Sequence, residues 1–387
     1  MRLLPWEYGV RNLLRRPSRS ALTLGGLTIV ILLVFVVVAF IRGLEKSLAA
    51  SGDPNVVLVY ALSSGADIEN SSIAARTPAL LSANLDGVQK RYGQRCLSPE
   101  LYLGTRITVD AEDITGLGLV RGVTTSAPLV RSKVQIVEGA WPRAGEVLVG
   151  RLAYSKLGSS AEALAIGKTV SFDGRQWRVS GTFAAGGSAF ESEMWCPLDS
   201  MQAALKRQDL SLVAVKMASG SSVSDVEMFC EERKSDLELK AVPEAAYYAA
   251  LQKHYKPVRM LGWIVVWLIA GAGVLAGLNT MYGAVVGRTR ELSSLQTIGF
   301  RRNAITLSLI QEAVLLAVGG SLIASALAFL LVNGAAVRFT MGAFTLQVDS
   351  VGVAIGCGVG LLLGVLGAIP PAIKAMRLPI AEGIKAV

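Results

Sequence analysis

The residues best suited to chemistry are few in this chain and do not gather into a recognisable site. His254 is the only histidine, and the four cysteines lie far apart at Cys96, Cys196, Cys230 and Cys357. Neither pattern has the short ligand spacing of a zinc site, and a single histidine gives the many serines no Ser-His-Asp triad. We therefore expect no metal site and no catalytic residues, so that the chain alone is not an enzyme.

The segment IGKT, Ile166 to Thr169, is similar to the end of a phosphate-binding loop. That motif needs a glycine five residues before Gly167, but Glu162 stands there, and a carboxylate repels phosphate. The segment also leads into a predicted hairpin instead of a helix. The sequence therefore predicts no nucleotide or other cofactor bound by this chain.

A short basic segment, GRTRELSSLQTIGFRR from Gly287 to Arg302, lies between two apolar runs. Leu292, Leu295 and Ile298 recur every three residues, which predicts a short amphipathic helix, and Gly299 stands where a helix C-cap would end it. Such a helix can lie on lipid, or it can offer its apolar stripe to a groove on a cytoplasmic protein. The residue pattern leaves both open. The charged residues around the stripe are Arg288, Arg290, Glu291, Arg301 and Arg302.

Composition indicates the class of protein that must position these residues. Hydrophobic residues make up 52% of the 387-residue chain, charged residues only 17%, and the mean hydropathy is +0.49, which is too apolar for a soluble domain of this length. A membrane-spanning helix needs roughly 20 predominantly apolar residues, and four uncharged runs are long enough. They contain 22 residues between Arg19 and Arg42, 28 between Arg259 and Arg288, 25 from Ala313 to Val337 and 24 from Ser350 to Ile373.

The first run could instead be a secretory signal peptide, because arginines precede it. Its apolar core is longer than that of a signal peptide, and FIRGLEKSLAAS ends it with charges instead of a cleavage site. We expect a membrane span there, and a mature N-terminus near Ala50 would contradict this.

The placement of charge predicts the topology. Residues 1–19, 288–302 and 374–387 together carry twelve basic and three acidic residues, which equals the whole net charge of +9. Short flanks rich in Lys and Arg stay in the cytoplasm, so both termini and the basic segment are expected there. Orientation in the membrane and attraction to anionic lipid headgroups together explain the basic character fully, and we expect no nucleic acid partner.

The fold class predicted is a membrane protein of four transmembrane helices, with a large α+β extracytoplasmic domain inserted between helices 1 and 2. Its predicted segments are a cytoplasmic amphipathic segment 1–19, spans 20–41, 258–287, 303–337 and 350–373, the extracytoplasmic domain 42–257, the cytoplasmic helix 288–302, an external loop 338–349 and a cytoplasmic tail 374–387.

The extracytoplasmic region is long enough for one or two compact domains. Alternating or β-rich runs predict strands, and Asp173-Gly174 between two of them predicts a hairpin. The segment FAAGGSAFES, 183–192, is expected to be a flexible surface loop. Cys96, Cys196 and Cys230 allow one disulfide whose pairing the sequence leaves open. The predicted strands are 55–62, 133–139, 146–150 and 168–183, and the predicted helices lie around 78–92, 200–207 and 224–238.

Small residues predict close approach of the spans. Gly356, Gly360 and Gly364 recur every four residues in the last span, and Gly273 and Gly277 do so in the second. Such stripes let membrane helices approach closely, either within one subunit or at a dimer seam.

Few ionisable groups interrupt the spans. Because Glu312 stands only about ten residues after Arg302, we expect it near the cytoplasmic headgroups, paired with a basic neighbour instead of acting in proton coupling.

The order of these motifs resembles a known family. The run GRTRELSSLQTIGFRRNAITLSLIQEAVLLAVGGSLIA, the tail AIPPAIKAMRLPIAEGIKA and the start RNLLRRPSRSALTLGGLTIVI are similar to segments of the MacB/FtsX-type ABC transporter permeases. GEVLVGRLAYSKLG and LAIGKTVSFDGRQWRVSGTF resemble the MacB-like periplasmic core domain of that family. The tail departs from the pattern in reading AEGIKA, where a leucine-arginine ending is frequent.

The resemblance implies a permease subunit with a separate ABC ATPase in two copies, which carries ATP and Mg²⁺ and docks on the helix from Arg290 to Gly299. It implies a homodimer or a pair with a related permease, in contact with lipid in the cytoplasmic (inner) membrane of a bacterium. In some members it also implies a periplasmic adaptor with an outer-membrane channel. ATP-driven movement of the external domain would then export or extract an amphiphile, drug, lipid or lipoprotein.

Two alternatives stay open. An FtsX-like regulator would activate an extracytoplasmic cell-wall hydrolase without transporting a substrate. A membrane-anchored receptor would use no ATPase, and the basic helix would then be only a lipid-surface element. The MacB-like core segments favour transport.

Overall fold

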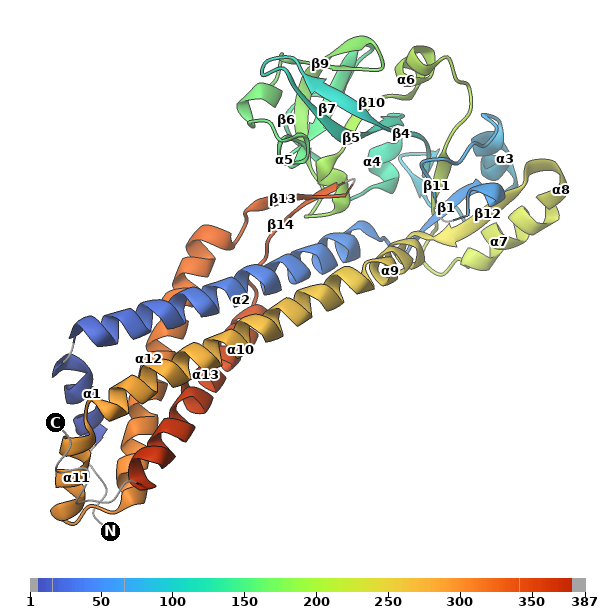
Figure 1. Ribbon diagram of the computed structural model, residues 1–387. Helices are drawn as coiled ribbons and strands as arrows, with labels where there is room; N and C mark the ends of the chain where they lie inside the picture. The colour runs from blue at the N-terminus through green and yellow to red at the C-terminus, as the bar shows by residue number, and fades with distance from the viewer. Residues whose placement is uncertain (1–5, 16, 66, 341, 378–387) are drawn as a thin grey trace. The chain divides into compact units, whose positions relative to one another are not determined.

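The computed structural model describes residues 6–15, 17–65, 67–340 and 342–377. The chain divides into two compact units (Figure 1). The helical unit comprises Met1–Arg42, Pro257–Ala335 and Leu346–Val387, and the α+β unit comprises Gly43–Lys256 with Ala336–Thr345. Residues 1–5 of the predicted N-terminal segment and 378–387 of the predicted tail lie outside the described residues.

Four helices are long and apolar enough to cross a membrane, one in each predicted span: Pro17–Ser51, Lys256–Val286, Arg302–Val332 and Ser350–Lys374. The helices of this part of the chain are α1 (Trp6–Arg15), α2 (Pro17–Ser51), α10 (Lys256–Val286), α11 (Thr289–Thr297), α12 (Arg302–Leu327), its π-helical end η4 (Ala328–Val332) and α13 (Ser350–Arg377).

Two span boundaries differ from the prediction. The first helix continues past residue 41 to Ser51, because LEKSLAA after Gly43 is rich in good helix formers, and the helix ends just before Gly52. The third helix ends at Val332 instead of Val337, since Gly334 has φ +82° and turns the chain into a strand. A predicted apolar run therefore need not be helical throughout.

The predicted glycine stripes lie against helices of the same chain. A methyl group added at Gly356 would stand 2.5 Å from the Phe35 ring, and one at Gly364 would stand 2.6 Å from the Ala317 methyl. The lack of side chains therefore lets α13 approach α2 and α12. The other close neighbours are Val30 and Leu363 for Gly273, Gly367 for Gly277, and Ser321 and Ile31 for Gly360.

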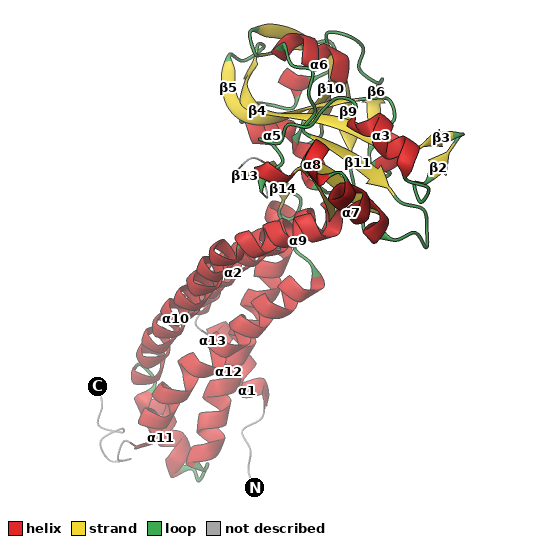
Figure 2. Cartoon of the chain, turned by 90° about the vertical axis from the view of Figure 1, so that its right-hand side faces the viewer, coloured by secondary structure: helices red, strands yellow, loops and turns green. Residues whose placement is uncertain are grey.

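The α+β unit is built on one ten-stranded mixed sheet, drawn in yellow in Figure 2. Its strand order is β12-β1-β11-β4-β5-β10-β7-β9-β6, and β8 pairs with β4 and β9. The strands are β1 (Val56–Ala61), β4 (Leu97–Val109), β5 (Ile114–Val123), β6 (Gln135–Gly139), β7 (Glu146–Gly150), β8 (Thr169–Phe172), β9 (Arg175–Ala184), β10 (Met194–Pro197), β11 (Leu212–Lys216) and β12 (Leu239–Pro243). A separate pair joins β2 (Lys90–Arg91) to β3 (Gln94–Arg95).

Strand β1 shows how both faces of the sheet are covered. Val57 and Val59 enter one apolar cluster, whereas Leu58 and Tyr60 enter another, because successive side chains of a strand point to opposite faces. The helices of this unit are α3 (Thr77–Asn84), α4 (Ala127–Val130), α5 (Ala153–Leu157), α6 (Leu198–Leu205), α7 (Val223–Glu232), α8 (Lys234–Leu237) and α9 (Glu244–His254), with 3-10 turns η1 (Leu62–Ser64), η2 (Glu162–Leu164) and η3 (Ala189–Ser192).

The hairpin between α12 and α13 belongs to the α+β unit. Its strands β13 (Ala336–Phe339) and β14 (Gly342–Thr345) pair antiparallel from Ala336 opposite Thr345 to Phe339 opposite Gly342. The predicted external loop, 338–349, therefore contains most of a small sheet that folds with residues 43–256.

Most predicted elements of this unit are confirmed. The four predicted strands correspond to β1, β6, β7 and the β8-β9 hairpin, whose turn residues Asp173 and Gly174 both have positive φ. The predicted helix around 78–92 is shorter, because α3 ends at Asn84.

The flexible surface loop predicted at 183–192 is wrong. Phe190 packs on Trp195, and the Glu191 side chain is fully buried. Its carboxylate accepts hydrogen bonds from the backbone N of Ala185 and of Gly187 at 2.7 and 2.9 Å. These bonds fix a segment whose small residues resemble those of a mobile loop.

The four cysteines are free thiols, and the histidine is exposed. Cys96, Cys196 and Cys230 are buried free thiols, so none of them forms the disulfide that the sequence allowed. His254 is exposed at the end of α9, as expected of a surface histidine, and its ring lies against Tyr255. Across the described residues no cluster of three His, Cys, Asp or Glu could hold a metal ion.

Candidate functional site

The helix predicted in the basic segment exists as α11 (Thr289–Thr297), and Gly299 ends it as expected. Gly299 has φ +102°, its backbone N donates to the Gln296 carbonyl, and the Phe300 N donates to the Leu295 carbonyl. This pair of hydrogen bonds is the Schellman motif, which glycine favours because it adopts positive φ without strain. The end of α11 is therefore sharply defined.

The predicted apolar stripe is divided between two environments. Leu292 is buried in a cluster with residues of α10, α12 and α13, and Leu295 packs against the same cluster. Ile298, in contrast, is 67% exposed. The stripe therefore fastens α11 to its own chain and leaves one apolar side chain on the surface.

Arg288 lies on the buried side of this segment. Its two terminal nitrogens donate to the two carboxylate oxygens of Glu312 at 2.8 and 3.0 Å, and both side chains are buried. Glu312 therefore pairs with a basic neighbour, as expected from the sequence. The pair holds the start of α11 to α12, so Arg288 is not part of the exposed surface.

Five further predicted residues, together with Ser294 and Thr297, form an exposed surface, which we call the α11 face. A hollow of about 500 Å³ lies beside it, bordered by residues 286–291 and Ser294. A helix presents residues three and four apart on one side, so these positions form a continuous contact area. The α11 face consists of Arg290, Glu291, Ser294, Thr297 and Ile298, followed by the exposed Arg301 and Arg302.

A network of ion pairs that the sequence did not predict is buried in the α+β unit. Arg121 is 1% exposed and pairs with both Glu193 and Glu100, and its Nε donates to Glu193 at 2.7 Å. Trp195 also donates to Glu193 at 2.8 Å, and Tyr102 lies under the guanidinium, 4.2 Å from Arg121 to the ring centroid. A buried charge is costly unless it is paired and hydrogen-bonded, and this arrangement satisfies both conditions.

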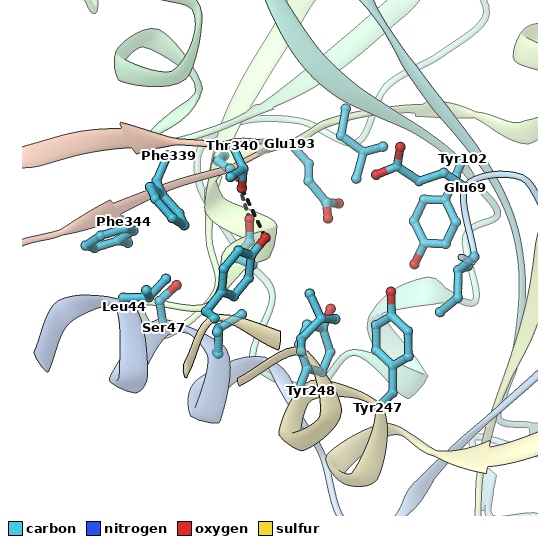
Figure 3. Close-up of a pocket in the computed structure, with 18 of the residues that line it drawn as sticks. Leu44, Ser47, Glu69, Tyr102, Glu193, Tyr247, Tyr248, Phe339, Thr340 and Phe344 are labelled. Carbon is cyan, nitrogen blue, oxygen red and sulfur yellow. Dashed lines mark hydrogen bonds between the residues drawn. The ribbon is translucent and has the colours of Figure 1, made fainter. Parts of the chain in front are cut away.

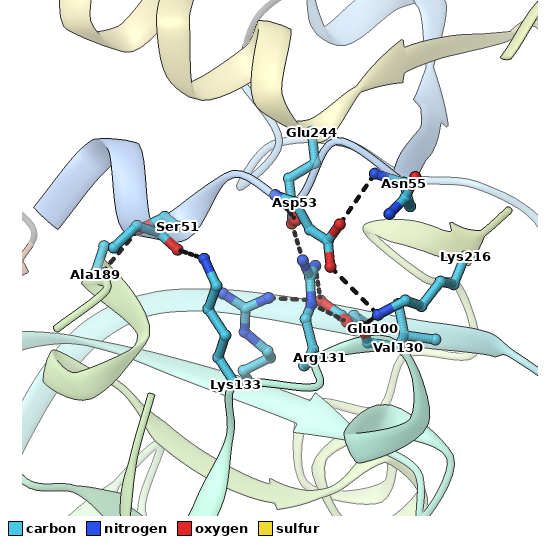
Figure 4. A network of polar contacts seen from close by, with 12 residues as sticks. Ser51, Asp53, Asn55, Glu100, Val130, Arg131, Lys133, Ala189, Lys216 and Glu244 are labelled. Carbon is cyan, nitrogen blue, oxygen red and sulfur yellow. Dashed lines mark hydrogen bonds and ion pairs between the residues drawn. The ribbon is translucent and has the colours of Figure 1, made fainter. Parts of the chain in front are cut away.

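Arg131 extends the network to α9 (Figure 4). It lies between Glu100 and Glu244 and pairs with both, and Glu244 accepts a hydrogen bond from the Asp53 backbone N at 3.0 Å. Burial alone would raise the pKa of Glu100, but the charges of Arg131 and Arg121 and their hydrogen bonds outweigh it and lower that pKa to about 2. The network thus ties the start of α9 and the residues after α2 to the sheet.

A signal for this network is visible in the sequence. Arg121 is a single cation in the apolar run LGLVRGV, and Glu100 stands between apolar residues in LSPELYL. Isolated charges inside strand-like runs indicate buried pairs, but their partners, Glu193 and Glu244, are too distant in the chain to be assigned from spacing.

The arrangement of helices and of the α+β unit indicates the class of protein. Four helices long and apolar enough to span a membrane, a short helix between the second and third, and an α+β unit formed by residues 43–256 and 336–345 are the architecture of a multi-pass membrane protein. The family model described as MacB-like periplasmic core domain matches residues 20–228, and the one described as FtsX-like permease C-terminal matches residues 263–380. The chain belongs to the MacB/FtsX-type ABC transporter permeases, and membership implies a partnering ATPase subunit.

One curated relative and two solved structures are similar to this chain. The chain is 23% identical over 404 residues to YknZ of Bacillus subtilis (strain 168), an uncharacterized ABC transporter permease, with 98% of each chain covered. Two solved structures are also similar. The periplasmic region of MacB from Actinobacillus actinomycetemcomitans is 12% identical, covers 54% of this chain and 97% of its own, and gives a TM-score of 0.40. The extracellular domain of the noncanonic ABC-type transporter YknZ from Gram-positive bacteria is 15% identical, covers 49% and 100%, and gives 0.37.

Proposed function

We propose that this chain carries movement, driven by ATP hydrolysis in a separate cytoplasmic ATPase, from α11 to an extracytoplasmic α+β unit. That movement would drive the export or extraction of an amphiphilic substrate, a drug, lipid or lipoprotein. ATP and Mg²⁺ would bind to the ATPase and not to this chain. One observation carries the proposal: α2 is a single helix from Pro17 to Ser51, whose last turns belong to the α+β unit.

The end of α2 is held firmly inside that unit. The Ser51 hydroxyl accepts a hydrogen bond from the Ala189 backbone N at 2.8 Å, and Lys133 donates to the Ala50 carbonyl at 2.7 Å (Figure 4). A helix transmits displacement along its axis because its backbone hydrogen bonds are continuous. A shift of the span would therefore pull on these contacts.

The other spans also lead into the unit along the chain. Helix α9 ends at His254 and α10 begins at Lys256, so only Tyr255 separates them. The β13-β14 hairpin is joined to α12 on one side and to α13 on the other. Each of the four spans is thus followed or preceded by a segment of the α+β unit.

The assembly that we propose places both termini and α11 in the cytoplasm, at the inner membrane of a bacterium. Two copies of the ATPase would bind a homodimer of this chain or a pair with a related permease. In a cell with an outer membrane, a periplasmic adaptor and an outer-membrane channel would complete the path.

The test combines affinity purification from native membranes, mass spectrometry and a change on the α11 face. We expect an ABC ATPase to co-purify with the wild-type chain, and Ile298→Asp to reduce its recovery about tenfold or more, because a charge replaces an apolar contact. Leu62→Asp makes the same change at an exposed residue of the α+β unit and should leave recovery unchanged. No ATPase in the wild-type sample would contradict the proposal, and an ATPase together with a cell-wall hydrolase would favour the FtsX-like regulator.

A further inference from the structure

The α+β unit contains a cavity of about 160 Å³ whose walls are mostly aromatic and apolar (Figure 3). Helix α9 contributes Tyr247 and Tyr248, the β13-β14 hairpin contributes Phe339 and Phe344, and the end of α2 contributes Leu44. For comparison, an apolar protein cavity of about 150 Å³ holds benzene. The volume is therefore sufficient for one ring-sized group.

One carboxylate in the wall has no countercharge. Glu69 is half-buried beside the cavity, and among the described residues its side chain makes no hydrogen bond or ion pair. Arg121 is the cation in the wall, but it is already paired with Glu193 and Glu100. Burial raises the pKa of Glu69, the negative charges of Asp67 and Glu193 raise it further, and Arg121 opposes them.

The buried network and Glu69 together hold more carboxylates than cations. Arg121 and Arg131 are the two cations of the buried network, against the carboxylates of Glu100, Glu193 and Glu244, and Glu69 adds a fourth. The hydroxyls of Tyr247 and Tyr248 make no hydrogen bond within the described part of the chain, so they are available to a ligand.

The carboxylates and aromatic rings of the cavity indicate which class of ligand it can bind. Carboxylates and aromatic faces both attract a cation, because a ring carries negative charge on its face. A bare metal ion does not fit, since the described residues offer no cluster of three metal-binding side chains. We propose that the cavity binds an organic ammonium ion, with its charge beside Glu69 and its apolar part against Tyr247, Tyr248 and the hairpin phenylalanines.

A ligand in the cavity would contact three segments of the α+β unit, each of which leads along the chain to a membrane span. The cavity walls come from the end of α2, from α9 and from the β13-β14 hairpin, all within the α+β unit. A bound ligand would hold these segments together. The binding itself stands independently of the proposed function, because it requires neither the ATPase nor transport.

The test uses the full-length chain in nanodiscs of phosphatidylglycerol, a lipid without an ammonium headgroup. Isothermal titration calorimetry would compare phenyltrimethylammonium with tert-butylbenzene, which has the same shape and no charge. We expect saturable binding of the cation, at least about tenfold tighter than that of the neutral compound. Glu69→Gln should abolish this preference, and Tyr247→Leu should weaken binding of both compounds. Glu138→Gln, at an exposed acid of β6, should change neither.

Two results would overturn the inference. The first is the absence of saturable binding to the wild-type chain. The second is equal affinity for both compounds together with no effect of Glu69→Gln, which would show an apolar cavity only.

A second set of nanodiscs identifies the natural source of the ammonium group. If phosphatidylethanolamine in the disc weakens the binding of phenyltrimethylammonium, the ligand is a lipid headgroup. If it does not, the ligand is a free molecule. Either result is compatible with the proposed site.

Discussion

At the scale of single residues, the buried Arg121 decides the integrity of the α+β unit. Replacing it with Met would leave Glu100 and Glu193 buried with one fewer partner each, and loss of one member of a buried ion pair costs about 3–5 kcal/mol. We expect Arg121→Met to lower the free energy of unfolding by about that amount, measured by urea denaturation of the full-length chain with tryptophan fluorescence. Arg106→Met, at an exposed position of β4, should change it by less than about 0.5 kcal/mol. Equal stability of the two variants would contradict the structural role of Arg121.

Because of Glu100, the stability of the α+β unit is expected to depend on pH. Its pKa in the folded chain is about 2, below the ordinary value of 4.5. A carboxylate with a lowered folded pKa contributes stability above its unfolded pKa, and that contribution is lost as the pH falls from about 4.5 towards about 2.

We therefore expect the free energy of unfolding to fall across this range in the wild-type chain, and to fall less steeply in Glu100→Gln. Urea denaturation at a series of pH values measures both. An identical slope in the two chains would show that Glu100 is not the group responsible.

Features that depend on neighbouring residues can be predicted from this sequence, whereas contacts between distant segments cannot. The apolar spans, the Asp173-Gly174 hairpin and the glycine that ends α11 all follow from local patterns, so they could be predicted. The partners of Arg121 and the occupants of the aromatic cavity depend on strand order and on segments far apart in the chain. Spacing in one sequence therefore could not identify them.

At the scale of elements, the glycines of α13 set how closely the helices approach. Gly364 faces the Ala317 methyl and the Ala313 backbone, whereas a methyl group added at Gly358 would meet no atom within 4 Å. We expect Gly364→Val to destabilise the chain by about 1–3 kcal/mol, as overpacking does, and Gly358→Val to have little effect. The melting temperature of the detergent-solubilised chain measures the difference. Equal melting temperatures would mean that α13 does not pack on α12 through this glycine.

For α11, the periodicity of apolar residues predicts the helix but not its contacts. The three-residue spacing of its apolar positions predicted the helix correctly, but not which neighbour the stripe contacts. Leu292 and Leu295 pack on the chain's own spans because these offer the nearest apolar surface, and this leaves the α11 face mainly polar. A docking surface for another protein must therefore use Ile298 and charged side chains.

At the scale of the whole molecule, the account rests on the continuity of α2 between the two units. Two glycines inserted between Arg42 and Gly43 would loosen this connection, because glycine is a poor helix former. We expect ATPase docking to remain and ATP-dependent transport to fall at least about tenfold. The same insertion after Gly220, in a turn with positive φ and open surroundings, should leave transport intact.

The most direct test of the central claim is hydrogen-deuterium exchange mass spectrometry of the full-length chain with its co-purifying ATPase, with ATP and then with ADP. We expect ATP-dependent changes in amide exchange both in α11 and in the α+β unit, at Gly43–Ser51 and in the β13-β14 hairpin. The change at Gly43–Ser51 should disappear when the two glycines are inserted before Gly43. Changes confined to α11 and the neighbouring helix ends would contradict the claim that this chain transmits movement from its ATPase to its α+β unit.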